Sequence, residues 1–211
     1  MIFIPVQTDE INMNGRHLAG VLFVIAVGEF FIGMMMAEAT YPGYNISSDT
    51  ISQLGSMVCH GSCRFIQPAA DIFNISVTVL GVIILIGGVA LFREDRPLSI
   101  TVVITGLGAI GVGLTLAAHS APILHGLVSL ITFVFAGISA LLSVREGGGV
   151  FAVICLVLGI LSLASTVLFT LGIYMGLGIG GMERMIVYPV LVWGASFGGY
   201  LISKGSKQGA T

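Results

Sequence analysis

Six apolar segments, each about 20 residues long, constrain the fold of this chain more than any other feature. A helix of roughly this length crosses the hydrocarbon core of a bilayer. Charged residues, proline or glycine-rich stretches separate the segments. Hydropathy and these breaks predict membrane spans at about 17–38, 68–92, 98–118, 123–143, 150–172 and 184–203.

The composition excludes a water-soluble domain. Charged residues make up 9% of the 211 residues and hydrophobic residues 56%, whereas a soluble domain carries about 25% charged residues. The net charge of -2 gives no reason to expect nucleic acid as a partner. We therefore predict an all-α, polytopic six-helix transmembrane bundle, with residues 1–211 as one domain in the cell membrane, surrounded by lipids.

Basic residues set the expected orientation, because cytoplasmic loops are enriched in lysine and arginine. In a six-span arrangement Arg64 and Arg184 fall on one side. The other basic residues fall on the opposite side, namely Arg16, Arg93, Arg96, Arg145, Lys204 and Lys207. This bias predicts that both termini are cytoplasmic and that the odd-numbered loops face outward.

The N-terminal segment lacks the basic region of a secretory signal, and no cleavage pattern follows the first apolar run. We therefore expect that run to be a membrane span. Met13 is an alternative initiator, in which case residues 1–12 would not belong to the native protein.

Glycines recur within the third and sixth spans. Gly194 and Gly198 form a GxxxG pattern, and the third span contains Gly106, Gly108, Gly111 and Gly113. Small residues allow helices to approach closely in lipid. We interpret these glycines as packing positions rather than ligand-binding positions.

The acidic residues divide by their expected side of the membrane. For the inner group, solvation by water is a sufficient explanation: Asp9, Glu10, Glu94, Asp95 and Glu146. Glu38, Asp49, Asp71 and Glu183 map to the outer face or to the first turn of a span. Glu29 lies deep in the first span, where an ionised carboxylate is costly. We expect a neutral, hydrogen-bonded Glu29, with a proton relay as the alternative.

Polar residues also form stripes that lead toward the outer boundary, where His119 ends the third span. The stripes are His125/Ser129/Thr132, Ser162/Thr166/Thr170 and Asp71/Asn74/Thr78. Polar groups at membrane depth usually face the bundle interior or a wet cavity, so the stripes predict a polar pocket that opens outward. Each stripe alone is also explained by hydroxyl groups that bond to their own helix or join helices.

The long outer loop contains Cys59, His60 and Cys63. A disulfide between Cys59 and Cys63 is the simplest outcome outside the cytoplasm. Free thiols and a metal site remain alternatives, but a fourth metal ligand is not evident. We therefore expect neither a metal nor another cofactor.

Four motifs follow one another along the chain. They are E-A-T-Y-P-G-Y-N-I-S-S-D-T-I-S-Q-L-G from Glu38, G-A-I-G-V-G-L from Gly108, H-G-L-V-S-L from His125, and G-G-M-E-R-M-I-V-Y-P-V-L-V-W from Gly180. In this order they resemble the prokaryotic six-span membrane family catalogued as domain of unknown function 998. A more distant similarity to eukaryotic six-span proteins of the Frag1 type implies lipid handling.

The motifs and the expected topology place one set of residues at the outer face. These candidate pocket residues are Glu38, Tyr41, Tyr44, Ser48, Asp49, Asp71, His119, His125, Glu183 and Arg184. Arg184 would pair with a phosphate or carboxylate, and His125 would act as a base or hydrogen-bond donor. For Asp49, capping a helical turn near Thr50 is the structural alternative.

We predict that this pocket binds a lipid or amphiphile of the outer leaflet, with processing of the bound molecule as a further alternative. The alternative to lipid binding is a scaffold or complex subunit, as a homo-oligomer or with another membrane protein, whose outer cluster is a structural network of salt bridges. A transporter is a third alternative. It is disfavoured because the two halves lack matching spans broken by glycine or proline.

Overall fold

The computed structural model describes residues 14–60, 62–117 and 122–208. Six long helices account for most of these residues, and each is long and apolar enough to span a membrane. Their bounds are α1 Gly15–Thr40, α2 Ala69–Ala90, α3 Arg96–Ala117, α4 Pro122–Leu142, α5 Gly149–Thr170 and α6 Gly178–Gln208. The predicted all-α fold of six membrane-crossing helices is confirmed.

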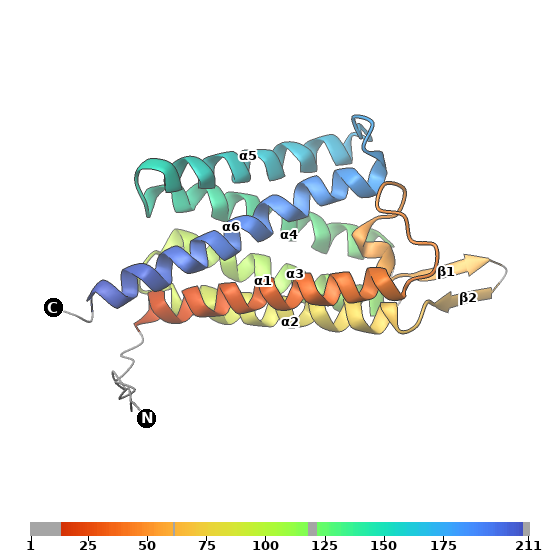
Figure 1. The fold of residues 1–211 in the computed structure, drawn as a ribbon, viewed down its shortest axis with the longest axis horizontal. Helices are drawn as coiled ribbons and strands as arrows, with labels where there is room; N and C mark the ends of the chain where they lie inside the picture. The colour runs from red at the N-terminus through yellow and green to blue at the C-terminus, as the bar shows by residue number, and fades with distance from the viewer. Residues whose placement is uncertain (1–13, 61, 118–121, 209–211) are drawn as a thin grey trace, which may run out of the picture.

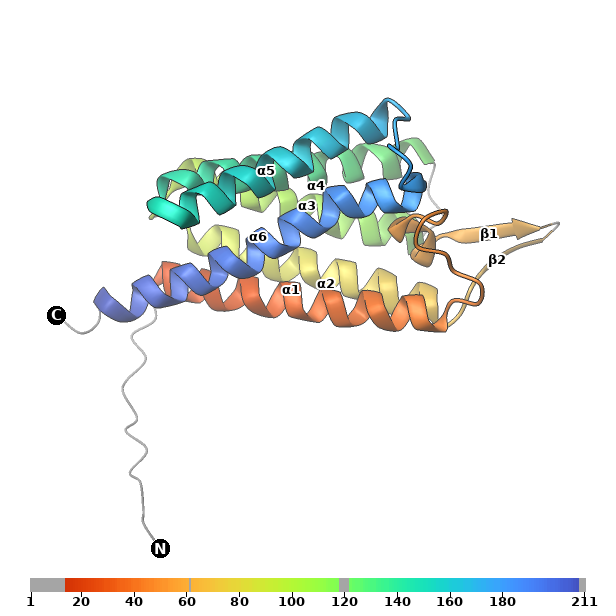
Figure 2. The same cartoon turned by 45° about the horizontal axis from the view of Figure 1, so that its top comes forward.

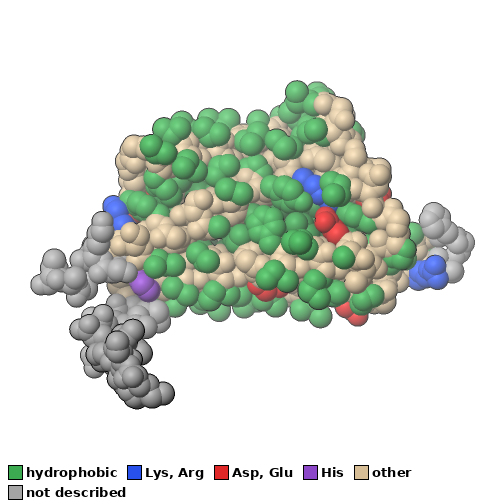
Figure 3. Space-filling model, viewed as in Figure 1, with side chains coloured by type: hydrophobic (Ala, Val, Ile, Leu, Met, Phe, Trp, Pro, Cys, Tyr) green, Lys and Arg blue, Asp and Glu red, His purple; other side chains and the backbone are tan. Residues whose placement is uncertain are grey.

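Helices that follow one another in the chain pack side by side, and α6 packs against α1. The six helices therefore form a closed ring whose members run along the long axis of the molecule (Figures 1 and 2). Hydrophobic side chains cover most of the length of the face seen in Figure 3, as contact with lipid requires.

Helix α1 begins and helix α6 ends at the same end of the ring, which we call the termini end. The opposite end carries the long α1–α2 connection and is called the loop end. An even number of crossings produces this arrangement. The cytoplasmic location of the termini stays a prediction.

Glycines lie where neighbouring helices come closest. A Cβ atom on Gly106 of α3 would lie 2.8 Å from the carbonyl oxygen of Gly81 in α2. A Cβ atom on Gly198 of α6 would lie 2.7 Å from the carbonyl oxygen of Gly20 in α1. At both crossings the backbones leave no room for a side chain, which confirms the packing interpretation of Gly106 and Gly198.

Acidic residues at the termini end do more than contact water. Arg16 of α1 forms ion pairs with Glu94 at 3.0 Å and Glu146 at 2.6 Å. Arg145 pairs with Asp95 at 3.0 Å. Solvation alone is thus a wrong explanation for these three acids. Glu94 and Glu146 join α1 to the α2–α3 and α4–α5 connections, and Asp95 joins these two connections to each other.

The α1–α2 connection contains structure that the hydropathy pattern does not predict. A short 3₁₀ helix, η1 (Ile51–Gly55), inserts at the loop end with Ile51 and Leu54 buried. A hairpin of β1 (Met57–His60) and β2 (Ser62–Phe65) then projects away from the bundle (Figures 1 and 2). In the structure Cys59 and Cys63 are joined by a disulfide across the two strands.

Candidate functional site

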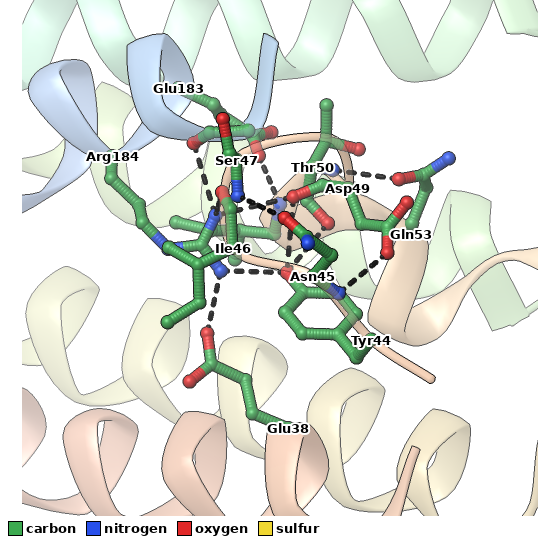
Figure 4. A network of polar contacts seen from close by, with 12 residues as sticks. Glu38, Tyr44, Asn45, Ile46, Ser47, Asp49, Thr50, Gln53, Glu183 and Arg184 are labelled. Carbon is green, nitrogen blue, oxygen red and sulfur yellow. Dashed lines mark hydrogen bonds and ion pairs between the residues drawn. The ribbon is translucent and has the colours of Figure 1, made fainter. Parts of the chain in front are cut away.

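A buried arginine holds the first part of the α1–α2 connection against α6. The Arg184 side chain is only 5% exposed and forms an ion pair with Glu38 of α1 at 2.6 Å. Its Nη2 atom also donates to the Tyr44 hydroxyl at 2.7 Å. The Nη1 atom donates to three carbonyl oxygens, those of Ile46, Asp49 and Gly180 (Figure 4). We call Arg184 and these partners the arginine clamp.

The clamp depends on an early start of α6. This helix begins at Gly178 rather than at 184 as predicted, so Arg184 lies inside the helix and not at its beginning. The Gly180 amide donates to the Ser47 carbonyl at 2.9 Å. A Cβ atom on Gly180 would collide with the carbonyl oxygen of Asp49. Residues 178–181 are thus helical, whereas Gly176 lies in the turn before the helix. The missing side chain of Gly180 lets the loop backbone approach the guanidinium group.

Glu183, the residue before the clamp arginine, binds the start of η1. Its carboxylate accepts a hydrogen bond from the Ile51 amide, and the residue is 5% exposed. An acidic group at the N-terminus of a helix satisfies amides that have no partner within the helix. Neighbouring residues on α6 therefore fix two consecutive parts of the connection, residues 41–50, which we call the clamp loop, and η1.

The loop also stabilises its own turns. The Asn45 side-chain oxygen accepts from the amides of Ser47 and Ser48, and the Asp49 carboxylate accepts from the Asn45 amide at 2.8 Å. Thr50 and Gln53 form the capping box of η1. Asp49 thus closes the preceding turn, whereas Thr50 and Glu183 cap the helix whose capping was the structural alternative for Asp49.

Burial shapes the acid–base behaviour of the two loop tyrosines. Burial raises the pKa of Tyr44 to about 12, although the Arg184 guanidinium opposes this shift. Burial and the nearby Asp49 carboxylate also raise the pKa of Tyr41. The Tyr41 ring meets the Tyr44 ring edge-on, with centroids 5.5 Å apart. Both phenols are neutral at physiological pH and serve as hydrogen-bonding and packing groups.

Other predicted pocket residues lie elsewhere. His125 of α4 has Thr115 of α3 at 3.2 Å and Ser129 at 3.4 Å as its hydrogen-bond partners among the described residues. Asp71 accepts from Gln67 at 2.9 Å. Ser48 is exposed, and His119 lies outside the described residues. The structure thus gathers Glu38, Tyr41, Tyr44, Asp49, Glu183 and Arg184 around the clamp loop.

A central cavity of about 120 Å³ lies inside the ring of helices, next to η1. All long helices except α5 contribute to its lining, which is mainly apolar. Glu183 and Ser52 provide polar groups at its loop end. Aromatic and aliphatic side chains form much of the wall, among them Phe23, Val27, Phe30, Phe73, Val77, Leu80, Phe133 and Trp193.

The polar stripes do not converge on one polar pocket. Ser129 and Thr132 reach the central cavity, but the Thr132 hydroxyl donates to the Val128 carbonyl of its own helix at 2.7 Å. Thr78 and Thr166 bond to their own helices in the same way. The prediction of a polar pocket is therefore corrected to an apolar cavity with a polar loop end. Its apolar lining has no signal in the sequence that separates it from ordinary core.

Across the described ranges, no three histidine, cysteine or acidic side chains are grouped so that they could hold a metal ion. The nearest approach to a reactive arrangement is the pair of His125 and Ser129, which lie one helical turn apart at 3.4 Å. Arg184 has its Nη atoms engaged by the chain itself. The site therefore offers a mainly apolar cavity, with the clamp loop and η1 held at its loop end.

Comparison with protein families gives one finding. The model of the family described as "Protein of unknown function (DUF998)" matches residues 24–199. This range includes the four motifs, the arginine clamp and all residues that line the central cavity except Phe23. No curated protein and no solved structure matches the chain.

Proposed function

The chain belongs to the DUF998 family of membrane proteins, and we propose that it binds one apolar chain of a membrane lipid or amphiphile in its central cavity. The observation that carries this proposal is the apolar lining of the cavity within a ring of membrane-spanning helices. An engineered cavity of about 150 Å³ lined by similar side chains stays dry and binds small apolar molecules.

The shape of the cavity favours a chain over a compact ligand. Its lining extends along α6 from Glu183 to Gly194, a distance of about 16 Å at 1.5 Å per residue. A volume of about 120 Å³ spread over this length is narrow. A space of this volume holds only a short apolar segment, such as the end of a hydrocarbon chain, which would regain the packing contacts that an empty cavity forgoes.

In this proposal the arginine clamp holds the loop above the cavity and does not bind a head group. Every hydrogen bond of the Arg184 Nη atoms goes to Glu38, Tyr44 or a backbone carbonyl of the chain. A phosphate could bind the Nη atoms only by displacing these partners, and the Nε atom, which has no hydrogen-bond partner among the described residues, is buried. Glu183 and Ser52 are the polar groups available to the end of a bound chain.

The test is to fill the cavity and to measure retained lipid. Ala109 lines the cavity and is 3% exposed. Ala109→Leu should reduce the lipid that co-purifies in mild detergent, as quantified by mass spectrometry of the extract. Ala164→Leu on the exposed side of α5 adds the same volume away from the cavity and should leave bound lipid unchanged.

The second candidate function is that of a scaffold whose loop-end cluster is purely structural. The closed set of partners around Arg184 favours it, because a structural cap needs no external ligand. If purified wild-type protein retains no more lipid in mild detergent than a fully delipidated sample, the result would support the scaffold. If Ala109→Leu and Ala164→Leu retain equal amounts of lipid, the cavity proposal is contradicted.

A further inference from the structure

Three hydrogen-bonding side chains connect α3 to α4 near the loop end of the central cavity. His125 and Ser129 lie one turn apart on the same face of α4, and Thr115 lies on α3. The Nδ1 atom of His125 is 3.2 Å from the Thr115 hydroxyl, and its Nε2 atom is 3.4 Å from the Ser129 hydroxyl. Ser129 also lines the cavity. The imidazole therefore lies between a hydroxyl of the neighbouring helix and a hydroxyl of the cavity wall.

The hydrogen bonds of Thr115 decide which nitrogen of His125 carries the proton. A threonine hydroxyl has a single proton, and Thr115 donates it to the carbonyl oxygens of Gly111 at 2.8 Å and Val112 at 3.0 Å. Its oxygen is therefore the acceptor for the Nδ1 proton of His125. In a neutral imidazole the Nε2 atom then has a free lone pair, which faces the Ser129 hydroxyl.

Ser129 differs in this respect from other hydroxyl residues of the bundle. Thr78, Thr132 and Thr166 each donate to the carbonyl oxygen four residues earlier in their own helix. The partner of Ser129 within the described part of the chain is the imidazole. A hydroxyl beside an imidazole that a third group orients is the arrangement of an activated nucleophile. The separation of 3.4 Å is long, as such contacts often are before a substrate binds.

The position of Ser129 indicates the kind of group that it would meet. Among the α4 residues in the cavity lining, Ser129 is the one nearest to the loop end, and the lining continues past Phe133 and Ala136. An apolar segment held in the cavity would therefore have its polar end beside Ser129. The volume of about 120 Å³ restricts this segment to a short one.

We propose that Ser129 is a nucleophile toward carboxylic esters with a short apolar acyl group, with His125 as its base and Thr115 as a positioning residue. The inference rests on the proposed function, because the cavity holds the acyl group. The Ser129 oxygen bonds to the ester carbonyl carbon while its proton passes to the Nε2 atom of His125. The bond between that carbon and the alcohol oxygen then breaks, and His125 gives the proton to the alcohol. Water splits the acyl-serine by the same route and releases the carboxylic acid.

The test uses the full chain in lipid nanodiscs and an alkyl fluorophosphonate, a reagent that forms a covalent bond with activated serines. The wild type should be labelled at Ser129, as located by mass spectrometry of peptides, and Ser129→Ala should lose this label. His125→Gln should slow the labelling about a hundredfold, the scale of general-base catalysis. An unlabelled Ser129 in the wild type, or an unchanged rate in His125→Gln, would overturn the proposal.

The role of Thr115 is tested by two replacements. Thr115→Val should slow the labelling about tenfold, the scale of one hydrogen bond, whereas Thr115→Ser keeps the hydroxyl and should stay within about twofold of wild type. Thr78→Val is the matched control, because the Thr78 hydroxyl bonds to its own helix and Thr78 is outside the cavity lining. Equal rates for Thr115→Val and Thr78→Val would contradict the positioning role.

Ester hydrolysis separates this inference from the proposed function. The wild type should hydrolyse para-nitrophenyl butyrate faster than the palmitate ester, because the cavity holds only a short segment, and Ser129→Ala should hydrolyse neither above the uncatalysed rate. A wild type that retains lipid but whose Ser129 does not react would overturn this inference and leave the cavity proposal intact. Labelling of Ser129 in a protein that retains no lipid would support the nucleophile and contradict the cavity proposal.

Discussion

At the residue scale, Arg184 joins α6 to the end of α1 and to the loop that follows it, both more than 130 residues earlier in the sequence. It contacts α1 through Glu38, the clamp loop through Tyr44 and two carbonyl oxygens, and its own helix through Gly180. A guanidinium group has five donors in a fixed plane, so it can satisfy several acceptors that a lysine ammonium group could not reach together. This explains why the loop backbone is organised around one side chain.

Arg184→Met should lower the free energy of unfolding by about 3–5 kcal/mol, because it leaves Glu38 and several carbonyl groups without their buried donor. Thermal melting in detergent would measure the loss. Lys204→Met removes a positive charge from an exposed position on the same helix and should change little. A melting temperature for Arg184→Met equal to that of the control would contradict the clamp.

The Tyr44 hydroxyl predicts an alkaline instability. Its pKa is raised from 10.0 to about 12 by burial, so the contribution of the neutral phenol is complete below about pH 10 and is lost as the pH rises toward 12. Ionisation would also remove the hydrogen bond that the phenol donates to the Thr50 carbonyl at 2.9 Å. The melting temperature of wild type should fall more steeply over this range than that of Tyr44→Phe. If the melting temperatures of wild type and Tyr44→Phe fall in parallel with pH, groups other than Tyr44 cause the loss of stability.

Sequence reasoning identified part of this network. The scaffold alternative predicted a network of salt bridges in the outer cluster, and the ion pair of Arg184 with Glu38 agrees with it. The carbonyl partners could not be predicted, because the path of the loop backbone is not encoded in any local pattern. The same holds for His125. Helical spacing predicts on which face of its helix His125 lies, but not that this face packs against α3, where Thr115 is its partner.

At the element scale, hydropathy placed the six helices well but not the features at their ends. The first five helices begin and end close to the predicted spans, because apolar length dictates them. Helix α6 starts at Gly178 because contacts with the clamp loop override the low helix propensity of glycine. The β1–β2 hairpin was missed because four-residue strands give too weak an alternation to recognise.

The close contact at Gly180 leads to a prediction for α6. Gly180→Ala should destabilise the protein by about 1–3 kcal/mol, because the new methyl group would force the Asp49 carbonyl away from Arg184. Gly199→Ala adds a methyl group to the same helix where no atom lies within 4 Å, and it should be neutral or slightly stabilising. Similar melting temperatures for both variants would show that the loop can shift without cost.

At the scale of the whole molecule, the ring separates two polar ends with different organisation. At the termini end, Arg16 and Arg145 form ion pairs with acids of the connections. At the loop end, a buried arginine and a buried glutamate hold an irregular segment over the cavity. The two ends are therefore chemically distinct, and the concentration of basic residues at the termini end supports its assignment to the cytoplasm.

This assignment gives a topology prediction for intact cells. In a background without other reactive cysteines, a cysteine at Ser56 should react with a membrane-impermeant maleimide, because it follows η1 at the loop end. A cysteine at Ser206 should react only after the membrane is permeabilised, because the positive-inside bias places it in the cytoplasm. The two sites serve as controls for each other, since a leaky membrane would label both. Labelling of Ser206→Cys alone would invert the orientation and place the arginine clamp on the cytoplasmic side, where a chain entering the cavity past η1 would come from the inner leaflet.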